Sequence, residues 1–258
     1  MTGVLPVALE SATKVIQTLL PAGKEYVCVI RLHGDVPEEK FRKAVNEFVG
    51  RIYQRPPLRS SVKRRLRVRE IYYIELQEIE GRNGLLRVGC EAGTYIRKLC
   101  HDIGEVLGCG AHMKELRRTR TGPFKEDTLA NLYDVVDAYH FWKEDGDESF
   151  LRKVIQPMEN ALEHIPKIFI RDSAVDSLCH GASLTVPGIV KLESGIETGS
   201  LVSIFTLKGE AVALGKAKMS SEEMYSSNHG IAVELNRVLM EPGTYPPLWK
   251  KHNKEGEE

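Results

Sequence analysis

The sequence lacks several features that define large classes of proteins. No run of eighteen consecutive apolar residues occurs, so we expect no membrane-spanning helix. The chain does not open with a basic segment followed by an apolar one, which predicts that it carries no secretory signal peptide. It contains no G-x-S-x-G motif, no phosphate-binding P-loop and no G-x-G-x-x-G after a strand. The residues alone therefore show neither a complete nucleophile–base pair nor a nucleotide-binding fingerprint.

Cysteine is scarce and does not occur in closely spaced pairs. The five cysteines are an odd number without C-x-x-C spacing, which indicates free thiols in a reducing compartment. Cys100, His101, Cys109 and His112 lie within thirteen residues of one another. Zinc ligands are usually paired more tightly, and the adjacent Cys100 and His101 would point in different directions on a helix. We therefore expect these four to be core or loop residues and predict no metal site.

The charge of the chain is unevenly distributed along its length. The 258 residues are 42% hydrophobic and 28% charged, as in an ordinary soluble globular protein, and the formal net charge is zero. Residues 1–125 nevertheless hold 23 Lys and Arg against 14 Asp and Glu, a net of +9, and residues 126–258 carry the compensating −9. This asymmetry indicates that the first half meets an anionic partner; two oppositely charged regions docking on each other is the alternative. Composition does not separate the two.

Hydrophobic spacing predicts an α+β organisation in two parts. Helices are expected over residues 8–20, 35–48, 95–107, 128–140 and 150–163, with Asp35 as a possible cap, and strands over 25–32, 71–80, 85–90 and 112–122. A turn at residues 81–84 predicts a hairpin, and residues 51–70 form a basic loop. After Pro166, short strands at intervals of roughly ten residues predict a small β-barrel, which places a domain boundary near Ile165. The polar segment 246–258 is expected to be disordered.

Two basic clusters lie in the first half. The segment from Arg51 to Arg69 holds eight Lys or Arg and no acid, and a second cluster follows Lys114. Cations spread along a surface are what phosphate binding requires, whereas a solvated basic face is the alternative reading of one charge run. Two clusters favour nucleic-acid binding. The residues that we predict to contact RNA are Arg55, Arg59, Lys63, Arg64, Arg65, Arg117 and Arg118.

Several segments together resemble a known enzyme family. They include TGVLPVALESAT, AGKEY, YQRPPLRSSVKRRLRVREIY, CEAGTYIRKLCHDIGEVLGCGAHMKELRRTRTG and GASLTVPGI. In this order they resemble the TruB-type pseudouridine synthases, and within these the archaeal counterparts of dyskerin, the catalytic subunit of box H/ACA ribonucleoproteins. The last region resembles a PUA domain, a small RNA-binding β-barrel. The resemblance covers almost the whole chain and excludes only the tail.

The resemblance implies an activity and a set of site residues. The family isomerises uridine to pseudouridine within RNA, on a nucleotide flipped out of its stack, without a metal or organic cofactor. It implies that Tyr26 stacks on the target base and assists proton removal at C5, that Tyr95 and Arg97 line the pocket, and that Leu116 lies against the base. Arg97 is expected to pair with the catalytic aspartate. Without the family, Tyr26 would be an ordinary strand aromatic, Leu116 a core residue and Arg97 a surface arginine near the start of a helix.

One departure from the family pattern concerns the nucleophile. The catalytic aspartate belongs to a segment G-T-L-D-P-x-x-T-G-x-L-P, and aligning Thr2 and Gly3 with it places that aspartate before Met1. No acid in the chain obviously replaces it, since Asp102 would point about 140° around the helix from Arg97. Two hypotheses follow: the sequence is a fragment or a wrongly started reading frame of a longer synthase, or it is a truncated paralogue that binds RNA without catalysis.

Together these observations predict a fold, a function and partners. We expect an N-terminally truncated synthase domain with a mixed β-sheet and flanking helices over residues 1–165, a PUA β-barrel over 166–245 and a tail over 246–258. The resemblance implies guide-directed pseudouridylation of ribosomal RNA, and modification of the T-loop of transfer RNA, in the cytoplasm. It implies guide RNA, substrate RNA and small accessory proteins of the H/ACA particle as partners. The alternatives are a non-catalytic RNA-binding scaffold and a stand-alone transfer-RNA synthase of bacterial type.

Overall fold

The computed structural model describes residues 2–56, 63 and 65–247, and they form two compact units. One unit comprises Met1–Val7 and Gln17–Gln156, and the other Ala8–Ile16 and Pro157–Glu258. The units do not follow a single cut in the chain, because the short segment Ala8–Ile16 groups with the later residues. No helix in the described ranges is long and apolar enough to cross a membrane.

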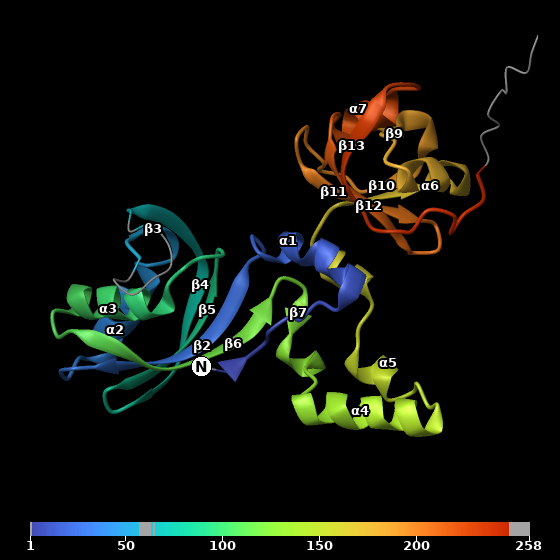
Figure 1. Ribbon diagram of the computed structural model, residues 1–258. Helices are drawn as coiled ribbons and strands as arrows, with labels where there is room; N and C mark the ends of the chain where they lie inside the picture. Colours follow the sequence, from blue (N-terminus) through green and yellow to red (C-terminus); the bar gives the residue numbers. More distant parts are fainter. Residues whose placement is uncertain (1, 57–62, 64, 248–258) are drawn as a thin grey trace, which may run out of the picture. The chain divides into compact units, whose positions relative to one another are not determined.

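A seven-stranded mixed sheet forms the first unit (Figure 1). Its strand order is β1-β6-β2-β5-β4-β3, with β7 added to β6. Every pair is antiparallel except β1 with β6. The strands are β1 (Thr2–Gly3), β2 (Lys24–Leu32), β3 (Gly50–Gln54), β4 (Arg67–Glu80), β5 (Asn83–Cys90), β6 (Ala111–Thr121) and β7 (Phe124–Lys125). The fold class expected from the sequence, a mixed sheet with flanking helices, is confirmed.

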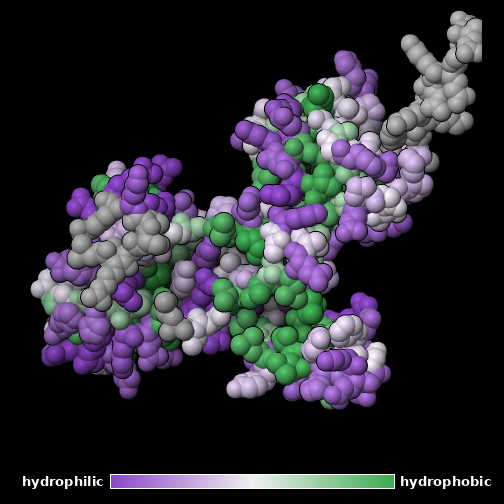
Figure 2. Space-filling view, in the orientation of Figure 1, coloured by the Kyte–Doolittle hydropathy of each residue, from purple (hydrophilic) through white to green (hydrophobic). Residues whose placement is uncertain are grey.

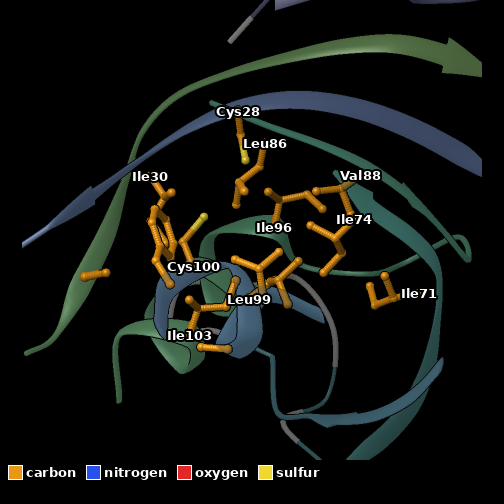
Figure 3. Packing of buried hydrophobic residues seen from close by; sticks show 14 of the residues in the cluster. Cys28, Ile30, Ile71, Ile74, Leu86, Val88, Ile96, Leu99, Cys100 and Ile103 are labelled. Carbon is orange, nitrogen blue, oxygen red and sulfur yellow. The ribbon is translucent and has the colours of Figure 1, made fainter. Parts of the chain in front are cut away.

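Two helices cover one face of this sheet and build its core. They are α2 (Glu38–Asn46) and α3 (Ile96–Leu107), which lie side by side in Figure 1. Alternate residues of β2 and β5, such as Cys28, Ile30 and Val88, point from the sheet toward Leu99 and Ile103 of α3 (Figure 3). Burial of such side chains contributes roughly 1.5–3 kcal/mol each. The core therefore fixes the position of α3 against the sheet.

Several local expectations for the first part of the chain need correction. The expected helix over residues 8–20 is a 3₁₀ turn, η1 (Glu10–Val15), followed by one short helix, α1 (Ile16–Leu19). Pro37 rather than Asp35 precedes α2, because the carboxylate of Asp35 instead accepts hydrogen bonds from Arg82. The hairpin between β4 and β5 is tighter than predicted, since Glu80 pairs directly with Asn83. The expected basic loop begins with an edge strand, β3.

A pair of helices, α4 (Leu132–Asp145) and α5 (Leu151–Val154), ends the first unit. A capping box between Asn131 and Asp134 starts α4, and Gly146 in a left-handed conformation ends it, so the helix lies later in the chain than predicted. The expected helix over 150–163 is interrupted before Pro157 and resumes as a 3₁₀ turn, η3 (Met158–Leu162). Hydrophobic side chains lie at the surface beside α4 (Figure 2), and Leu132 and Tyr133 are both more than four-fifths exposed.

The second unit contains a six-stranded sheet with its own core. The strand order is β10-β8-β11-β12-β13-β9, in which only β11 and β8 run parallel. The strands are β8 (Lys167–Ile170), β9 (Leu184–Thr185), β10 (Ile189–Leu192), β11 (Leu201–Thr206), β12 (Ala211–Ala217) and β13 (Ile231–Val238). The spacing of hydrophobic residues did not predict β10, the helices α6 (Asp172–Cys179) and α7 (Ser221–Ser226), or the short turn η4 (Val186–Gly188). These elements are too short for hydrophobic periodicity to reveal them.

Candidate active site

Tyr26 lies in β2 on the sheet face that α2 and α3 cover. Its strand partners are Val88 in β5 and Arg118 in β6, and its half-buried side chain packs against the core. Burial raises the pKa of the Tyr26 phenol, and the neighbouring Cys90 thiol acts in the same direction. The charge of Arg118 and a hydrogen bond from its guanidinium oppose this increase without cancelling it. Tyr26 therefore remains protonated at neutral pH, with Arg118 beside its hydroxyl group.

A β-bulge in β6 brings Arg118 opposite Tyr26. Glu25 pairs with Arg120, whereas the next residue of β2, Tyr26, pairs with Arg118, so Thr119 is the extra residue. Leu116 pairs with Cys28, two residues beyond Tyr26, and packs against the core from the same face. The structure thus brings together Tyr26, Leu116 and Arg118, although the sequence assigned the first two to the pocket and Arg118 to RNA binding.

The short strand β1 holds Arg118 in place. The Val4 N–H donates to the Arg118 carbonyl over 2.8 Å, and the Arg118 Nε donates to the Val4 carbonyl over 2.6 Å. Gly3 permits this close approach, because a Cβ there would lie 2.1 Å from the Arg118 carbonyl oxygen. Arg118 is therefore a half-buried, fixed cation rather than a free surface charge.

The G-T-Y-I-R segment forms the start of α3. Gly93 has a φ of +80°, and Tyr95 is the residue before the first helical turn. The side chain of the buried Gln54 of β3 forms two hydrogen bonds with the Tyr95 backbone. Its Oε1 accepts from the Tyr95 N–H over 2.9 Å, and its Nε2 donates to the Tyr95 carbonyl over 3.2 Å. Arg97 is exposed in the first turn of α3. The segment leaves the sheet directly after β5, at the end where β2 begins.

Lys24, the first residue of β2, and Cys90, the last residue of β5, lie at this end of the sheet. They are strand partners, and the Lys24 ammonium donates to the carbonyls of Leu19, Leu20 and Ala22 over 2.7–3.0 Å. Burial lowers the pKa of Lys24, and the charge of Arg118 lowers it further. Burial raises the pKa of the Cys90 thiol to about 11, so it is inert as a nucleophile at neutral pH. Neither residue was singled out from the sequence, because their roles depend on strand pairing.

The two aspartates considered from the sequence are engaged elsewhere. Asp102 pairs with Lys98 one helical turn away, over 2.6 Å, and Asp35 pairs with Arg82. Within the described ranges, no group of three or more His, Cys, Asp or Glu residues could hold a metal ion. All five cysteines are free thiols.

Five of the seven predicted RNA-binding residues lie in the described part of the chain, in three groups, whereas Arg59 and Arg64 lie outside it. Arg55, Lys63 and Arg65 are exposed in the basic segment. Arg117 forms an ion pair with Glu126 over 2.7 Å on the exposed sheet face. The third group is Arg118 alone, which faces Tyr26.

Three family models match consecutive parts of the chain. The model described as TruB family pseudouridylate synthase (N terminal domain) matches residues 1–96, and that of the tRNA pseudouridylate synthase B C-terminal domain matches 97–163. A PUA domain matches residues 166–239. A probable tRNA pseudouridine synthase B of Methanopyrus kandleri is 66% identical over 249 residues, which cover 96% of this chain and 74% of the relative. The chain belongs to the TruB family of pseudouridylate synthases.

Solved structures support the assignment of this chain to the TruB family. A structure described as a Cbf5-Nop10-Gar1 complex matches with a TM-score of 0.91 and 64% identity, over 95% of this chain and 74% of the other. A structure of an H/ACA RNP bound to a substrate RNA containing 2'-deoxyuridine matches with a TM-score of 0.90 and 60% identity, over 96% and 75%. The predicted resemblance to dyskerin-type TruB synthases and the PUA domain are confirmed. Pseudouridine synthesis, an isomerisation, is the activity of this family.

Proposed function

We propose that this TruB-family chain isomerises uridine in RNA at the pocket end of its sheet, in a cytoplasmic particle with a guide RNA and small accessory proteins. The proposed targets are ribosomal RNA and the T-loop of transfer RNA. The observation that carries the proposal is the register between β2 and β6, which sets Tyr26, Leu116 and Arg118 side by side where α3 begins. Similarity to a structure of an H/ACA RNP bound to a substrate RNA supports the choice of partners.

The residues of the pocket have distinct proposed roles. A flipped uracil needs a flat surface on which to stack and an apolar wall, and Tyr26 and Leu116 supply these. Since Tyr26 is protonated, its hydroxyl group is a donor before any proton is removed from the base. A raised pKa also makes its conjugate base stronger, and Arg118 would stabilise that anion. Arg97, exposed at the start of α3, is free to pair with a carboxylate as a planar fork.

Phosphate contacts are proposed for the exposed cations. Arg55, Lys63 and Arg65 extend from the edge of the sheet near β3 and β4, and each phosphate neutralised should add about 0.7–0.9 to the slope of log affinity against log salt. Replacing Lys63 with Gln should reduce that slope by about this amount. Asp35→Asn, which alters an exposed ion pair with Arg82, is the control and should leave it unchanged.

A second candidate function is an RNA-binding scaffold without catalysis. One observation favours it: the two aspartates considered from the sequence are both paired with cations, Asp102 with Lys98 and Asp35 with Arg82. Release of tritium from RNA containing [5-³H]uridine separates the two functions, because isomerisation removes the C5 proton and binding does not. The assay is run with transfer RNA alone and with a guide RNA plus accessory proteins.

The outcomes of this assay differ for each proposal. Release that depends on the guide and is lost in Tyr26→Ala supports the synthase. Release from transfer RNA alone supports a stand-alone enzyme, and binding without release under any condition supports the scaffold. The mass of the protein purified from its native cells, compared with 29.0 kDa for this chain, tells whether the assayed polypeptide is the native one.

A further inference from the structure

A buried carboxylate lies directly behind the proposed pocket. Glu25 precedes Tyr26 in β2, so its side chain points to the opposite face of the sheet. Only 8% of Glu25 is exposed, although that face is otherwise rich in polar and charged side chains. Charged residues are rarely buried to this extent unless they are paired. The partners of Glu25 therefore indicate what the carboxylate does.

Glu25 connects four adjacent strands through side-chain contacts. Its Oε1 accepts a hydrogen bond from the Thr119 hydroxyl of β6 over 2.7 Å. Its Oε2 accepts from the Tyr73 hydroxyl of β4 and forms an ion pair with Arg87 of β5 over 3.0 Å. Arg87 also approaches Glu75 of β4 over 3.6 Å. One carboxylate thus joins β6, β2, β5 and β4.

The contact with Tyr73 depends on a glycine. Tyr73 pairs with Gly89 of β5, and Gly89 pairs with Glu25, so the Tyr73 side chain must pass over β5 to reach β2. A Cβ at Gly89 would lie 2.3 Å from the Tyr73 ring. The missing side chain of Gly89 therefore provides the path by which the Tyr73 hydroxyl reaches Glu25.

The contact with Thr119 lies at the β-bulge. Thr119 is the extra residue that allows Arg118, rather than Thr119, to oppose Tyr26. Its hydroxyl donates to Glu25 and is buried with it on the far face. The residue that Glu25 holds is thus the one whose position decides which side chain faces Tyr26.

We propose that Glu25 is a positioning residue for the reaction: by holding Thr119 in the bulge and joining β2 to β4, β5 and β6, it fixes Tyr26 and Arg118 against the target base. The proposal rests on the proposed function, in which Tyr26 contacts that base. Burial acts to raise the pKa of Glu25, but the hydrogen bonds from Tyr73, Thr119 and Arg87 and the charge of Arg87 outweigh it and hold the pKa below its usual value. Glu25 is therefore ionised at neutral pH and accepts all three contacts.

The test compares four variants of the full chain with the unmodified protein: Glu25→Gln, Thr119→Val, Thr119→Ser and Asp35→Asn. Glu25→Gln keeps the shape of the side chain but removes its charge and one acceptor, and Thr119→Val removes only the hydroxyl that marks the bulge. Asp35→Asn is the control, because Asp35 also pairs with an arginine, Arg82 of the turn between β4 and β5, but lies beyond the other end of β2. The first readout is the titration of the Tyr26 phenol by NMR of [ζ-¹³C]tyrosine, assigned with Tyr26→Phe. The second is tritium release from [5-³H]uridine RNA, measured beside RNA affinity.

The proposal predicts a loss of order around Tyr26 in both variants. In Glu25→Gln and Thr119→Val, the Tyr26 titration should move up, because a displaced Arg118 no longer offsets the effect of burial, and Asp35→Asn should leave it in place. Turnover should fall by roughly ten- to a hundredfold with RNA affinity within about twofold, as expected for misplaced reacting groups. Thr119→Ser keeps the hydroxyl group, so both readouts should equal those of the unmodified protein.

Other outcomes overturn the proposal. An unmoved Tyr26 titration in folded Glu25→Gln rules it out even if turnover falls, and so does an equal shift in Asp35→Asn. If Glu25→Gln does not fold, Thr119→Val decides by the same criteria. If the unmodified protein releases no tritium, the proposed function fails, whereas the Tyr26 titration still decides whether Glu25 positions that residue.

Discussion

Replacing Gly104 with Ala should destabilise the first unit, although helix propensity alone predicts the opposite. Gly104 lies inside α3, where alanine is favoured over glycine by about 1 kcal/mol. However, a Cβ at Gly104 would lie 2.1 Å from the Ala111 nitrogen and 2.5 Å from the Gly110 carbonyl carbon. Both are backbone atoms that cannot rotate away. The Gly110 N–H also donates to the Gly104 carbonyl over 3.0 Å, which holds the two segments together.

The balance of the two effects gives the expected size. Overpacking costs typically about 1–3 kcal/mol, and a backbone clash of this depth belongs at the upper end. After subtracting about 1 kcal/mol for propensity, the free energy of unfolding should fall by about 2 kcal/mol. For a domain of this size, that corresponds to a Tm lowered by roughly 4–8 °C.

Calorimetry of the full chain, with circular dichroism to follow the helices, measures this change. The control is Gly108→Ala at the end of α3, where φ is +75° and no atom lies within 4 Å of the added Cβ. That substitution should cost only the left-handed strain, about 1–2 kcal/mol, without separating α3 from β6. A Tm for Gly104→Ala equal to or above that of the unmodified protein would refute the reasoning, because propensity would then outweigh the contact.

Three further outcomes follow from the site. Gln54→Leu leaves the Tyr95 N–H without its side-chain acceptor and should lower the free energy of unfolding in urea by about 1–3 kcal/mol, whereas Tyr53→Phe on the exposed side of the same strand should change it little. The pKa of Glu25 is lowered in the folded state, so its contribution to stability is present above the ordinary glutamate pKa of about 4.3 and is lost as the pH falls through the folded pKa. The difference in the free energy of unfolding between the unmodified protein and Glu25→Gln should therefore shrink between pH 7 and pH 3. A constant difference would contradict this. Because burial raises the pKa of Cys90 to about 11, iodoacetamide at pH 8 should modify the half-buried Cys109 well before Cys90, as mass spectrometry of tryptic peptides would show; equal rates would contradict the buried position of Cys90.

The sequence predicted β2 and α3 well, whereas the equally periodic segment at residues 8–20 forms a 3₁₀ turn and one short helix. The strand at residues 25–32 and the helix at 95–107 agree with β2 and α3 to within about one residue. The short edge strand β3 was missed because Arg51 and Gln54 made the segment look like part of a basic loop, although Ile52 between them packs against the core. Asp35 was predicted as a cap because the residue that binds its carboxylate, Arg82, lies 47 residues later in the chain. Local spacing carries no information about such a partner.

The candidate site shows a sharper limit. Tyr26 and Leu116 were predicted as site residues from a family motif, and they lie on neighbouring strands of one face. Arg118 was assigned to RNA binding because it is one of several cations in its segment. A perfectly alternating β6 would place Thr119 opposite Tyr26, and only the bulge brings Arg118 there. No pattern in a single sequence marks the residue at which a strand gains one position, so the partner of Tyr26 could not be predicted.

The two sides of the proposed pocket are attached to the fold separately. One side is the start of β2 with Tyr26, and the other is the start of α3 with Tyr95 and Arg97, almost seventy residues later. Each side is held by contacts that do not involve the proposed reacting groups: Lys24 by three carbonyls, and Tyr95 by the side chain of Gln54. Because the supporting contacts are separate from the reacting groups, a substitution can disturb the position of those groups without removing any of them. Substitutions at Lys24 or Gln54 should therefore reduce turnover while every proposed pocket residue is still present, whereas substitutions at Lys63 should act on RNA affinity.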